Sequence, residues 1–127
     1  MGAISIPRVG VLGCGTMAGA MVERWLDEEL VLPKQLSVST QRSLSPFLVR
    51  LNVAASSNQH VLESSDVVLL GIKPYQLIDV CDRLTFRSDQ IVLSVLAGTP
   101  FEKLTSAVAP ARAVRLMPNL AVRLCKG

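Results

Sequence analysis

Short apolar runs alternate with helix-length amphipathic segments from one end of the chain to the other. The runs are rich in Val, Leu and Ile and are too short for helices, which is typical of buried strands. Strands that alternate with helices predict a parallel sheet with right-handed crossovers. We therefore expect an α/β fold of the Rossmann type: a doubly wound, mostly parallel six-stranded sheet with helices on both faces. The expected strands are 8–12, 36–40, 53–55, 67–72, 91–96 and 113–117, and the expected helices are 16–27, 46–51, 58–64, 74–84 and 101–108.

The pattern also predicts local roles for single residues. Asn58 is expected to cap the short third helix, because its side chain can accept from a backbone N–H group there. Tyr75 and Cys81 are expected to pack in the fourth helix, and His60 is expected to face solvent. The first helix should bury one face, formed by Met17, Ala18, Met21, Val22, Trp25 and Leu26.

Composition narrows the class of protein. A chain of 127 residues is long enough for one domain with a substantial core. Half of the residues are apolar and 18% are charged, which argues against a disordered chain. No apolar run approaches the roughly 20 residues of a membrane-spanning helix, so we expect no membrane association. The net charge of +3 with only 4% aromatic residues disfavours nucleic acid as a partner. No metal site is expected.

The cysteines indicate a reducing compartment. Cys14, Cys81 and Cys125 form no C-x-x-C pair, and three thiols cannot all pair with one another. The first residues lack the features of a secretory signal peptide, because Arg8 interrupts their only apolar stretch. We therefore expect a cytoplasmic protein.

A glycine-rich turn follows the first expected strand. Gly13, Gly15 and Ala18 form the pattern G-x-G-x-x-A at the start of the first helix, which is the context that dinucleotide-binding sites require. Gly13 permits a tight turn, Gly15 lets the backbone approach a diphosphate, and the helix N-terminus favours negative charge. Such turns also occur without a ligand, and the strand before and the helix after are what favour a dinucleotide here.

The end of the second strand indicates which dinucleotide is bound. NAD sites usually carry an acidic residue about 20 residues after the glycines, which accepts from the ribose 2′-hydroxyl. Residues 38–43 contain no acid, but they contain Ser39, Thr40 and Arg42. Hydroxyl groups and a guanidinium suit a 2′-phosphate, so we expect NADPH, with NADH possible. The alternative is that Arg42 is a solvated surface residue.

Four blocks of sequence, at residues 13–18, 66–74, 91–98 and 114–119, together resemble the pyrroline-5-carboxylate reductases. The resemblance implies a reductase that transfers hydride from NAD(P)H to the ring C=N of 1-pyrroline-5-carboxylate in proline biosynthesis. It also implies that the cofactor lies along the carboxyl ends of the strands. The cofactor-binding residues expected in this way, together with those of the glycine turn, are Leu12, Gly13, Cys14, Gly15, Thr16, Met17, Ala18, Ser39, Thr40, Arg42, Asn58, Gly71, Ile72, Lys73, Pro74, Val95, Leu96, Ala97 and Asn119.

The resemblance also implies what residues 1–127 lack. The family continues with Thr-Pro where this chain has Leu120 and Ala121, which leaves the exact substrate open. Its members have a second, helical domain that forms a homo-oligomer and binds the small-molecule substrate. We therefore expect residues 1–127 to be the NAD(P)-binding domain, and the catalytic residues to belong to that second domain.

Two other functions stay open. A hydroxyacid or coenzyme F420-linked reductase shares the glycine turn, but lacks the pair of motifs Lys73-Pro74 and Met117-Pro118-Asn119. A non-catalytic nucleotide-binding module is the alternative of a different class, because nothing in this chain is placed as a general acid.

Overall fold

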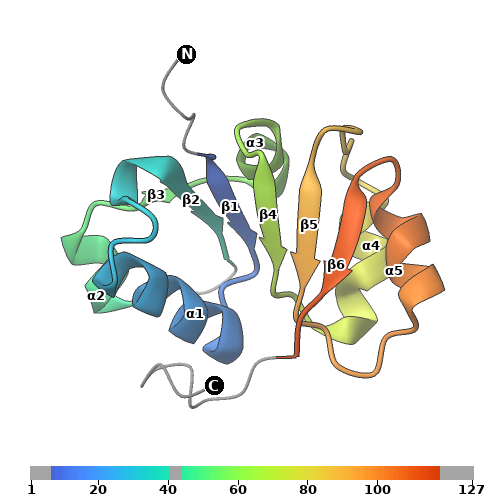
Figure 1. The fold of residues 1–127 in the computed structure, drawn as a ribbon, viewed down its shortest axis with the longest axis horizontal. Coiled ribbons are helices and arrows are strands. Elements are labelled where there is room, and N and C mark those ends of the chain that lie inside the picture. Colours follow the sequence, from blue (N-terminus) through green and yellow to red (C-terminus); the bar gives the residue numbers. More distant parts are fainter. Residues whose placement is uncertain (1–6, 41–43, 118–127) are drawn as a thin grey trace.

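Six parallel strands form one sheet in the computed structural model, which describes residues 7–40 and 44–117 (Figure 1). The strand order is β3-β2-β1-β4-β5-β6, so the chain runs outward from β1 to one edge and then returns to the centre at β4. This confirms the predicted doubly wound sheet, with every described strand pair parallel. The strands are β1 (Val9–Leu12), β2 (Leu36–Ser39), β3 (Ala54–Ala55), β4 (Val67–Leu70), β5 (Ile91–Ser94) and β6 (Arg112–Arg115).

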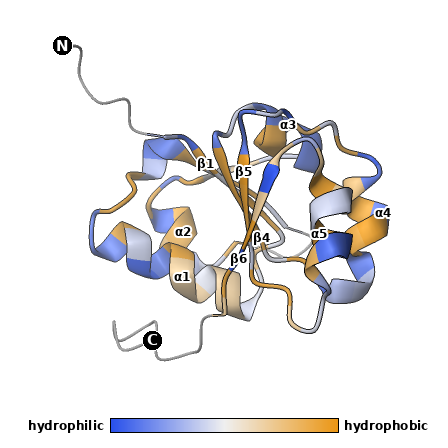
Figure 2. Ribbon diagram, turned by 45° about the vertical axis from the view of Figure 1, so that its right-hand side comes forward, coloured by the Kyte–Doolittle hydropathy of each residue, from blue (hydrophilic) through white to orange (hydrophobic). Residues whose placement is uncertain are grey.

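Helices cover both faces of the sheet, as predicted (Figure 2). Helices α1 and α2 lie on one face, and α3, α4 and α5 lie on the other. The helices are α1 (Thr16–Asp27), α2 (Pro46–Arg50), α3 (Asn58–Glu63), α4 (Leu77–Cys81) and α5 (Phe101–Val108), with 3₁₀ turns η1 (Pro33–Gln35) and η2 (Pro74–Gln76).

The central strands are apolar along their whole length because both of their faces are buried. In β4, Val68 and Leu70 pack against the side of α3, α4 and α5, whereas Leu69 packs against the side of α1 and α2. All three side chains are fully buried. The alternation follows from the two-residue period of a strand, which sends successive side chains to opposite faces.

Helix α3 lies very close to β1 because of Gly10. A Cβ atom at Gly10 would come within 2.2 Å of Ser65 Oγ and 2.7 Å of Val61 Cγ1, so no larger residue fits. The buried Gln90 side chain stabilises the same region, because its amide donates to the carbonyl oxygens of Leu62 and Ser65 at 2.8 and 3.0 Å. These contacts place the start of α3 beside the carboxyl ends of β1 and β2.

Four local predictions are settled by the structure. The N-cap of α3 is Ser57, whose Oγ accepts from the backbone N–H of His60 at 3.3 Å, so the prediction that Asn58 caps this helix is wrong. Tyr75 is 82% exposed and does not pack in the core, which also differs from the prediction. Cys81 is buried and His60 is exposed, as predicted.

The fourth helix is shorter than predicted. The expected helix over 74–84 consists of the turn η2 followed by α4, which ends at Cys81. The preceding strand also ends early, at Leu70, since Gly71 and Ile72 leave the sheet. This early departure creates the loop that lines the site described below. Within the described ranges, none of the helices combines the length and apolar character that a membrane crossing requires.

Candidate cofactor-binding site

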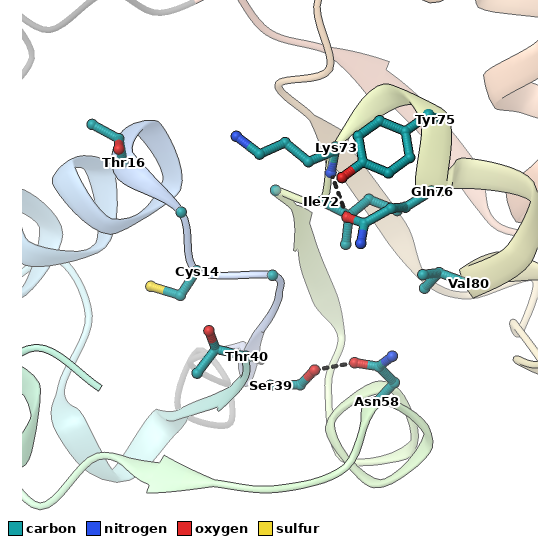
Figure 3. A pocket seen from close by; sticks show the side chains of 13 residues that line it. Cys14, Thr16, Ser39, Thr40, Asn58, Ile72, Lys73, Tyr75, Gln76 and Val80 are labelled. Carbon is teal, nitrogen blue, oxygen red and sulfur yellow. Dashed lines mark hydrogen bonds between the residues drawn. The ribbon is translucent and has the colours of Figure 1, made fainter. Parts of the chain in front are cut away.

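A solvent-open cleft of about 240 Å³ lies at the carboxyl ends of β1, β2 and β4 (Figure 3). In open α/β sheets, ligands bind at this edge, where the strand order reverses. Between β1 and β4 the chain changes direction across the sheet, so the cleft lies at the reversal point. Its lining residues are Gly13, Cys14, Gly15, Thr16, Ser39, Thr40, Asn58, Gly71, Ile72, Lys73, Tyr75, Gln76 and Val80.

Gly13 forms the tight turn that leaves β1. Its φ of +80° lies in the left-handed region, and a Cβ there would come within 2.8 Å of Ile72 Cγ2. Its N–H donates to the carbonyl oxygen of Ser39 at 2.8 Å. The turn is therefore held between the end of β2 and the loop after β4, and only glycine satisfies both the backbone angle and the available space.

The start of α1 is open to a ligand. Gly15 is the N-cap of this 12-residue helix, no side chain caps it, and its first turn carries no acidic residue. A Cβ at Gly15 would meet nothing closer than the Gly71 carbonyl oxygen at 3.9 Å. Unbonded N–H groups at a helix start attract anions, and the bare glycine leaves room for a bulky one. This geometry fits a diphosphate.

Gly71 and Ala18 bring the first helix close to the end of β4. A Cβ at Gly71 would come within 2.4 Å of the Gly13 carbonyl oxygen and 2.6 Å of Ala18 Cβ. The Gly71 N–H donates to the carbonyl oxygen of Leu12 at 2.8 Å. The small residues thus permit backbone-to-backbone contact that fixes the glycine turn in place.

Polar groups from β2 and α3 form the lower part of the cleft in Figure 3. The Ser39 hydroxyl donates to Asn58 Oδ1, which leaves the Asn58 Nδ2 group directed away from Ser39. Thr40 lies beside Ser39. The Asn58 Nδ2 group can donate to a phosphate or to sugar oxygens, and no carboxylate stands among the described lining residues to repel a phosphate.

Lys73 supplies the positive charge of the cleft. Its exposed side chain extends toward the start of α1, where Thr16 lies (Figure 3). It forms no ion pair with any residue of the described ranges, and it is the one charged residue of the described lining. An ammonium group beside uncapped helix N–H groups strengthens the attraction for an anionic ligand.

The structure brings together most of the residues predicted for the cofactor site. Ten of them line the cleft: Gly13, Cys14, Gly15, Thr16, Ser39, Thr40, Asn58, Gly71, Ile72 and Lys73. The side chains of Leu12, Ala18 and Leu96 are instead buried in the core. Met17 and Val95 pack half-buried against the α1 side of the sheet. Pro74 and Ala97 are exposed and do not line the cleft, and Arg42 and Asn119 lie outside the described residues.

Three lining residues were not predicted from the sequence, namely Tyr75, Gln76 and Val80. They follow Lys73 and Pro74 in η2 and α4, where the pattern predicted one continuous helix. The 3₁₀ turn redirects the chain, so these side chains face the cleft. The only signal in the sequence that these residues line the cleft was that they follow Lys73 closely along the chain.

The cysteine in the glycine turn is not an activated nucleophile. Burial raises the pKa of the Cys14 thiol, and the negative charge of Glu23 raises it further. Burial likewise raises the pKa of the Cys81 thiol to about 11, with a smaller contribution from Asp82. Both thiols therefore stay protonated at neutral pH, whereas reactive cysteines have lowered pKa values.

The raised pKa of Cys81 predicts a loss of stability at alkaline pH. An unfolded cysteine titrates near pH ~8.5, so the folded state binds the thiol proton more tightly. The stabilisation is present below that pH and is lost as the pH rises toward about 11. We expect the urea midpoint of unfolding to fall between pH 8.5 and 10.5, and to fall less steeply in Cys81→Ala. Equal slopes in both proteins would contradict this assignment.

The fold and the cleft together define the class of protein. A parallel sheet in the order β3-β2-β1-β4-β5-β6, with a glycine turn leading into an uncapped helix at its centre, is a Rossmann-type domain. Comparison with known protein families supports this assignment to a class. The family model described as NADP oxidoreductase, coenzyme F420-dependent, matches residues 8–98, and the chain belongs to this family.

Individual proteins are similar to this chain over most of its length. A pyrroline-5-carboxylate reductase of Methanosarcina acetivorans is 30% identical over 90% of this chain and 44% of its own length. The 1-pyrroline-5-carboxylate reductase of Streptococcus pyogenes is 28% identical, with a TM-score of 0.75 over 94% of this chain and 46% of its own. A pyrroline carboxylate reductase of Plasmodium falciparum, solved with NADP bound, is 20% identical and shares the fold, with a TM-score of 0.82 over 93% of this chain and 44% of its own.

These matches confirm the predicted resemblance to the N-terminal domain of the pyrroline-5-carboxylate reductases. The chain spans about half the length of the relatives it matches, at 44 and 46% for the first two. The family description names coenzyme F420, which belongs to one of the alternatives considered above. Its match ends at residue 98, before the block at 114–119, whereas the named relatives match 90% or more of the chain.

Proposed function

We propose that this chain binds NADPH and forms the cofactor-binding part of a reductase that converts 1-pyrroline-5-carboxylate to proline. The observation that carries the proposal is the uncapped start of α1 at Gly15, in a cleft whose described lining holds one basic and no acidic residue. The relatives named above support the choice of reaction. NADPH would supply the hydride, and this chain's residues would hold and orient the cofactor.

Each part of the cleft has a role in this proposal. The backbone of residues 13–16 binds the diphosphate at the helix start, and Lys73 neutralises part of its charge. Ser39 and Thr40, with Arg42, hold the 2′-phosphate, and Asn58 lies beside the adenosine ribose. The nicotinamide lies toward the carboxyl ends of β5 and β6, near Val95, Leu96, Ala97 and Asn119.

We further propose that the substrate site belongs to the half of the relatives that this chain does not match. Hydride transfer requires the substrate to be held at contact distance from the nicotinamide. The described cleft is open to solvent and offers no pair of groups placed as acid and base. We therefore expect residues 1–127 alone to bind cofactor with little turnover, and the complete reductase to be a cytoplasmic homo-oligomer. The free thiols of Cys14 and Cys81 are in keeping with that location.

Titration with NADPH and NADH tests the proposal directly. We expect calorimetry to show tighter binding of NADPH, because the lining hydroxyls and Arg42 suit a 2′-phosphate. Arg42→Ala should remove a charge-assisted hydrogen bond of roughly 1.5–3 kcal/mol from NADPH and leave NADH affinity unchanged. Arg50→Ala is the matched control, since Arg50 is exposed on α2 and stacks over Phe47. Equal binding of both cofactors by the unmodified chain would contradict the 2′-phosphate site.

A further inference from the structure

The loop that joins β5 to α5 has a tip that its own hydrogen bonds do not hold. This β5–α5 loop consists of residues 95–100 and lies at the same edge of the sheet as the glycine turn (Figure 1). Within the described part of the chain, the peptide groups of Ala97 and Gly98 form no hydrogen bond. Gly98 has a φ of +69°, and a Cβ there would meet nothing within 4 Å, so close packing does not hold the tip either. The position of the loop therefore depends on what holds its two ends.

The start of the β5–α5 loop is fixed by the neighbouring strands. The Val95 N–H donates to the carbonyl oxygen of Leu70, at the end of β4, at 3.3 Å. Ser94 is buried, and its Oγ accepts from the Leu96 N–H at 3.2 Å. The Ser94 carbonyl oxygen accepts from the Leu116 N–H at 2.7 Å, which ties the end of β5 to the chain that leaves β6. The first two residues of the loop are thus held by the sheet itself.

The other end of the β5–α5 loop is held by the side chain of Arg115, the last residue of β6. Its guanidinium donates to the carbonyl oxygen of the buried Thr99, which is 16 residues away in the sequence. The same group lies over the ring of Phe101, with Cζ 5.9 Å from the ring centroid. A charged donor forms a stronger hydrogen bond than a neutral one, and a planar guanidinium can bond and stack at the same time. Arg115 therefore ties the loop and the first residue of α5 to the strand beside them.

We propose that Arg115 is a positioning residue, which keeps the β5–α5 loop in the conformation that receives the nicotinamide. This inference rests on the proposed function, in which the nicotinamide lies near Val95, Leu96 and Ala97. Arg115 acts through the loop, because its guanidinium is already engaged by Thr99 and Phe101. A loop that leaves this conformation offers a competent site only for the remaining fraction of the time, and the apparent affinity falls in proportion to that fraction. Ligands that end at the diphosphate and its ribose do not reach the loop and are unaffected.

Calorimetric titration of the 127-residue chain with NADPH and with 2′-phospho-ADP-ribose, which lacks the nicotinamide, tests this role. Arg115→Met removes the donor and keeps much of the length of the side chain. We expect it to bind NADPH roughly 3- to 10-fold more weakly, as for a loop in place about a third to a tenth of the time, and 2′-phospho-ADP-ribose within about twofold of the unmodified chain. Arg115→Lys keeps a charged donor and should bind NADPH more tightly than Arg115→Met. Arg112→Met is the matched control and should change neither affinity, since Arg112 is exposed at the start of β6 and points to the opposite face of the sheet.

The outcomes distinguish this inference from the function on which it rests. If the unmodified chain binds NADPH no more tightly than 2′-phospho-ADP-ribose, or if Arg115→Met binds NADPH as tightly as the unmodified chain, the positioning role is overturned and the proposed function stands. If Arg115→Met weakens both ligands equally, or Arg115→Lys binds NADPH no better than Arg115→Met, Arg115 has only a general structural role and the inference is also overturned. If the unmodified chain binds neither ligand, the proposed function fails and this inference fails with it.

Discussion

Gly15→Ser is expected to abolish high-affinity NADPH binding without weakening the fold. The serine Cβ and hydroxyl would occupy the open space at the start of α1, where a Cβ at Gly15 would meet nothing closer than the Gly71 carbonyl oxygen at 3.9 Å. The hydroxyl would also accept from the N–H groups that we propose bind the diphosphate. Losing two charge-assisted hydrogen bonds of at least ~1.5 kcal/mol each lowers the affinity about 100-fold or more.

We expect the same substitution to leave the stability of the fold almost unchanged or to increase it slightly. Serine is a preferred N-cap residue, and no side chain caps α1 in the present sequence. We expect the free energy of unfolding to rise by roughly a few tenths of a kcal/mol. Calorimetric titration with NADPH and urea unfolding of the same preparation measure the two effects. A variant that binds NADPH as tightly as the unmodified chain would show that the diphosphate does not approach Gly15.

Gly71→Ala is expected to destabilise the fold strongly. The new methyl group would lie 2.4 Å from the Gly13 carbonyl oxygen and 2.6 Å from Ala18 Cβ. Both neighbours belong to the rigid turn and helix, so neither can move without separating α1 from β4. Overpacking of this kind costs roughly 2–3 kcal/mol, a large share of the ~5–15 kcal/mol stability of a typical domain.

Gly19→Ala is the matched control for this second prediction. Gly19 lies inside α1, and a Cβ there would meet Cys14 Sγ at 3.7 Å, which is an ordinary contact. Alanine favours a helix over glycine by up to about 1 kcal/mol, so this variant should gain stability and keep its NADPH affinity. Urea unfolding checks both variants. The close packing of the turn would be disproved if Gly71→Ala unfolded at the same urea concentration as Gly19→Ala.

The glycine turn was the most predictable part of the site. Gly13, Gly15 and Ala18 are close in the sequence, and their spacing, with the apolar run before them and the amphipathic segment after them, predicted the strand, the turn and the helix that the structure contains. Ser39 and Lys73 could also be placed, because Ser39 lies near the end of one expected strand and Lys73 directly follows another. Residues at the ends of parallel strands meet at one edge of a sheet, whatever the details of packing.

Residues after a change of backbone direction could not be placed in this way. Tyr75 was expected to pack in a helix, but Pro74 and the two Gln76 hydrogen bonds form a 3₁₀ turn that leaves its ring exposed at the cleft. Asn58 was expected to cap α3, but Ser57 has that role, and Asn58 instead accepts from Ser39 on a different strand. Both outcomes depend on hydrogen bonds that compete with the local pattern.

The amino-acid sequence by itself determined the strand count, the parallel sheet, the glycine turn and the charge of the site, because these follow from hydrophobic periodicity and from which residue types tolerate a tight turn. Only the tertiary structure decided which side chains share the cleft. Gly71 leaves no room for a side chain because of atoms at Gly13 and Ala18, which are 58 and 53 residues away in the sequence. Tyr75, Gln76 and Val80 line the cleft because a 3₁₀ turn precedes α4. Contacts between segments that are distant in the sequence depend on how closely the helices approach the sheet. That distance is determined jointly by all the side chains packed between the helices and the sheet.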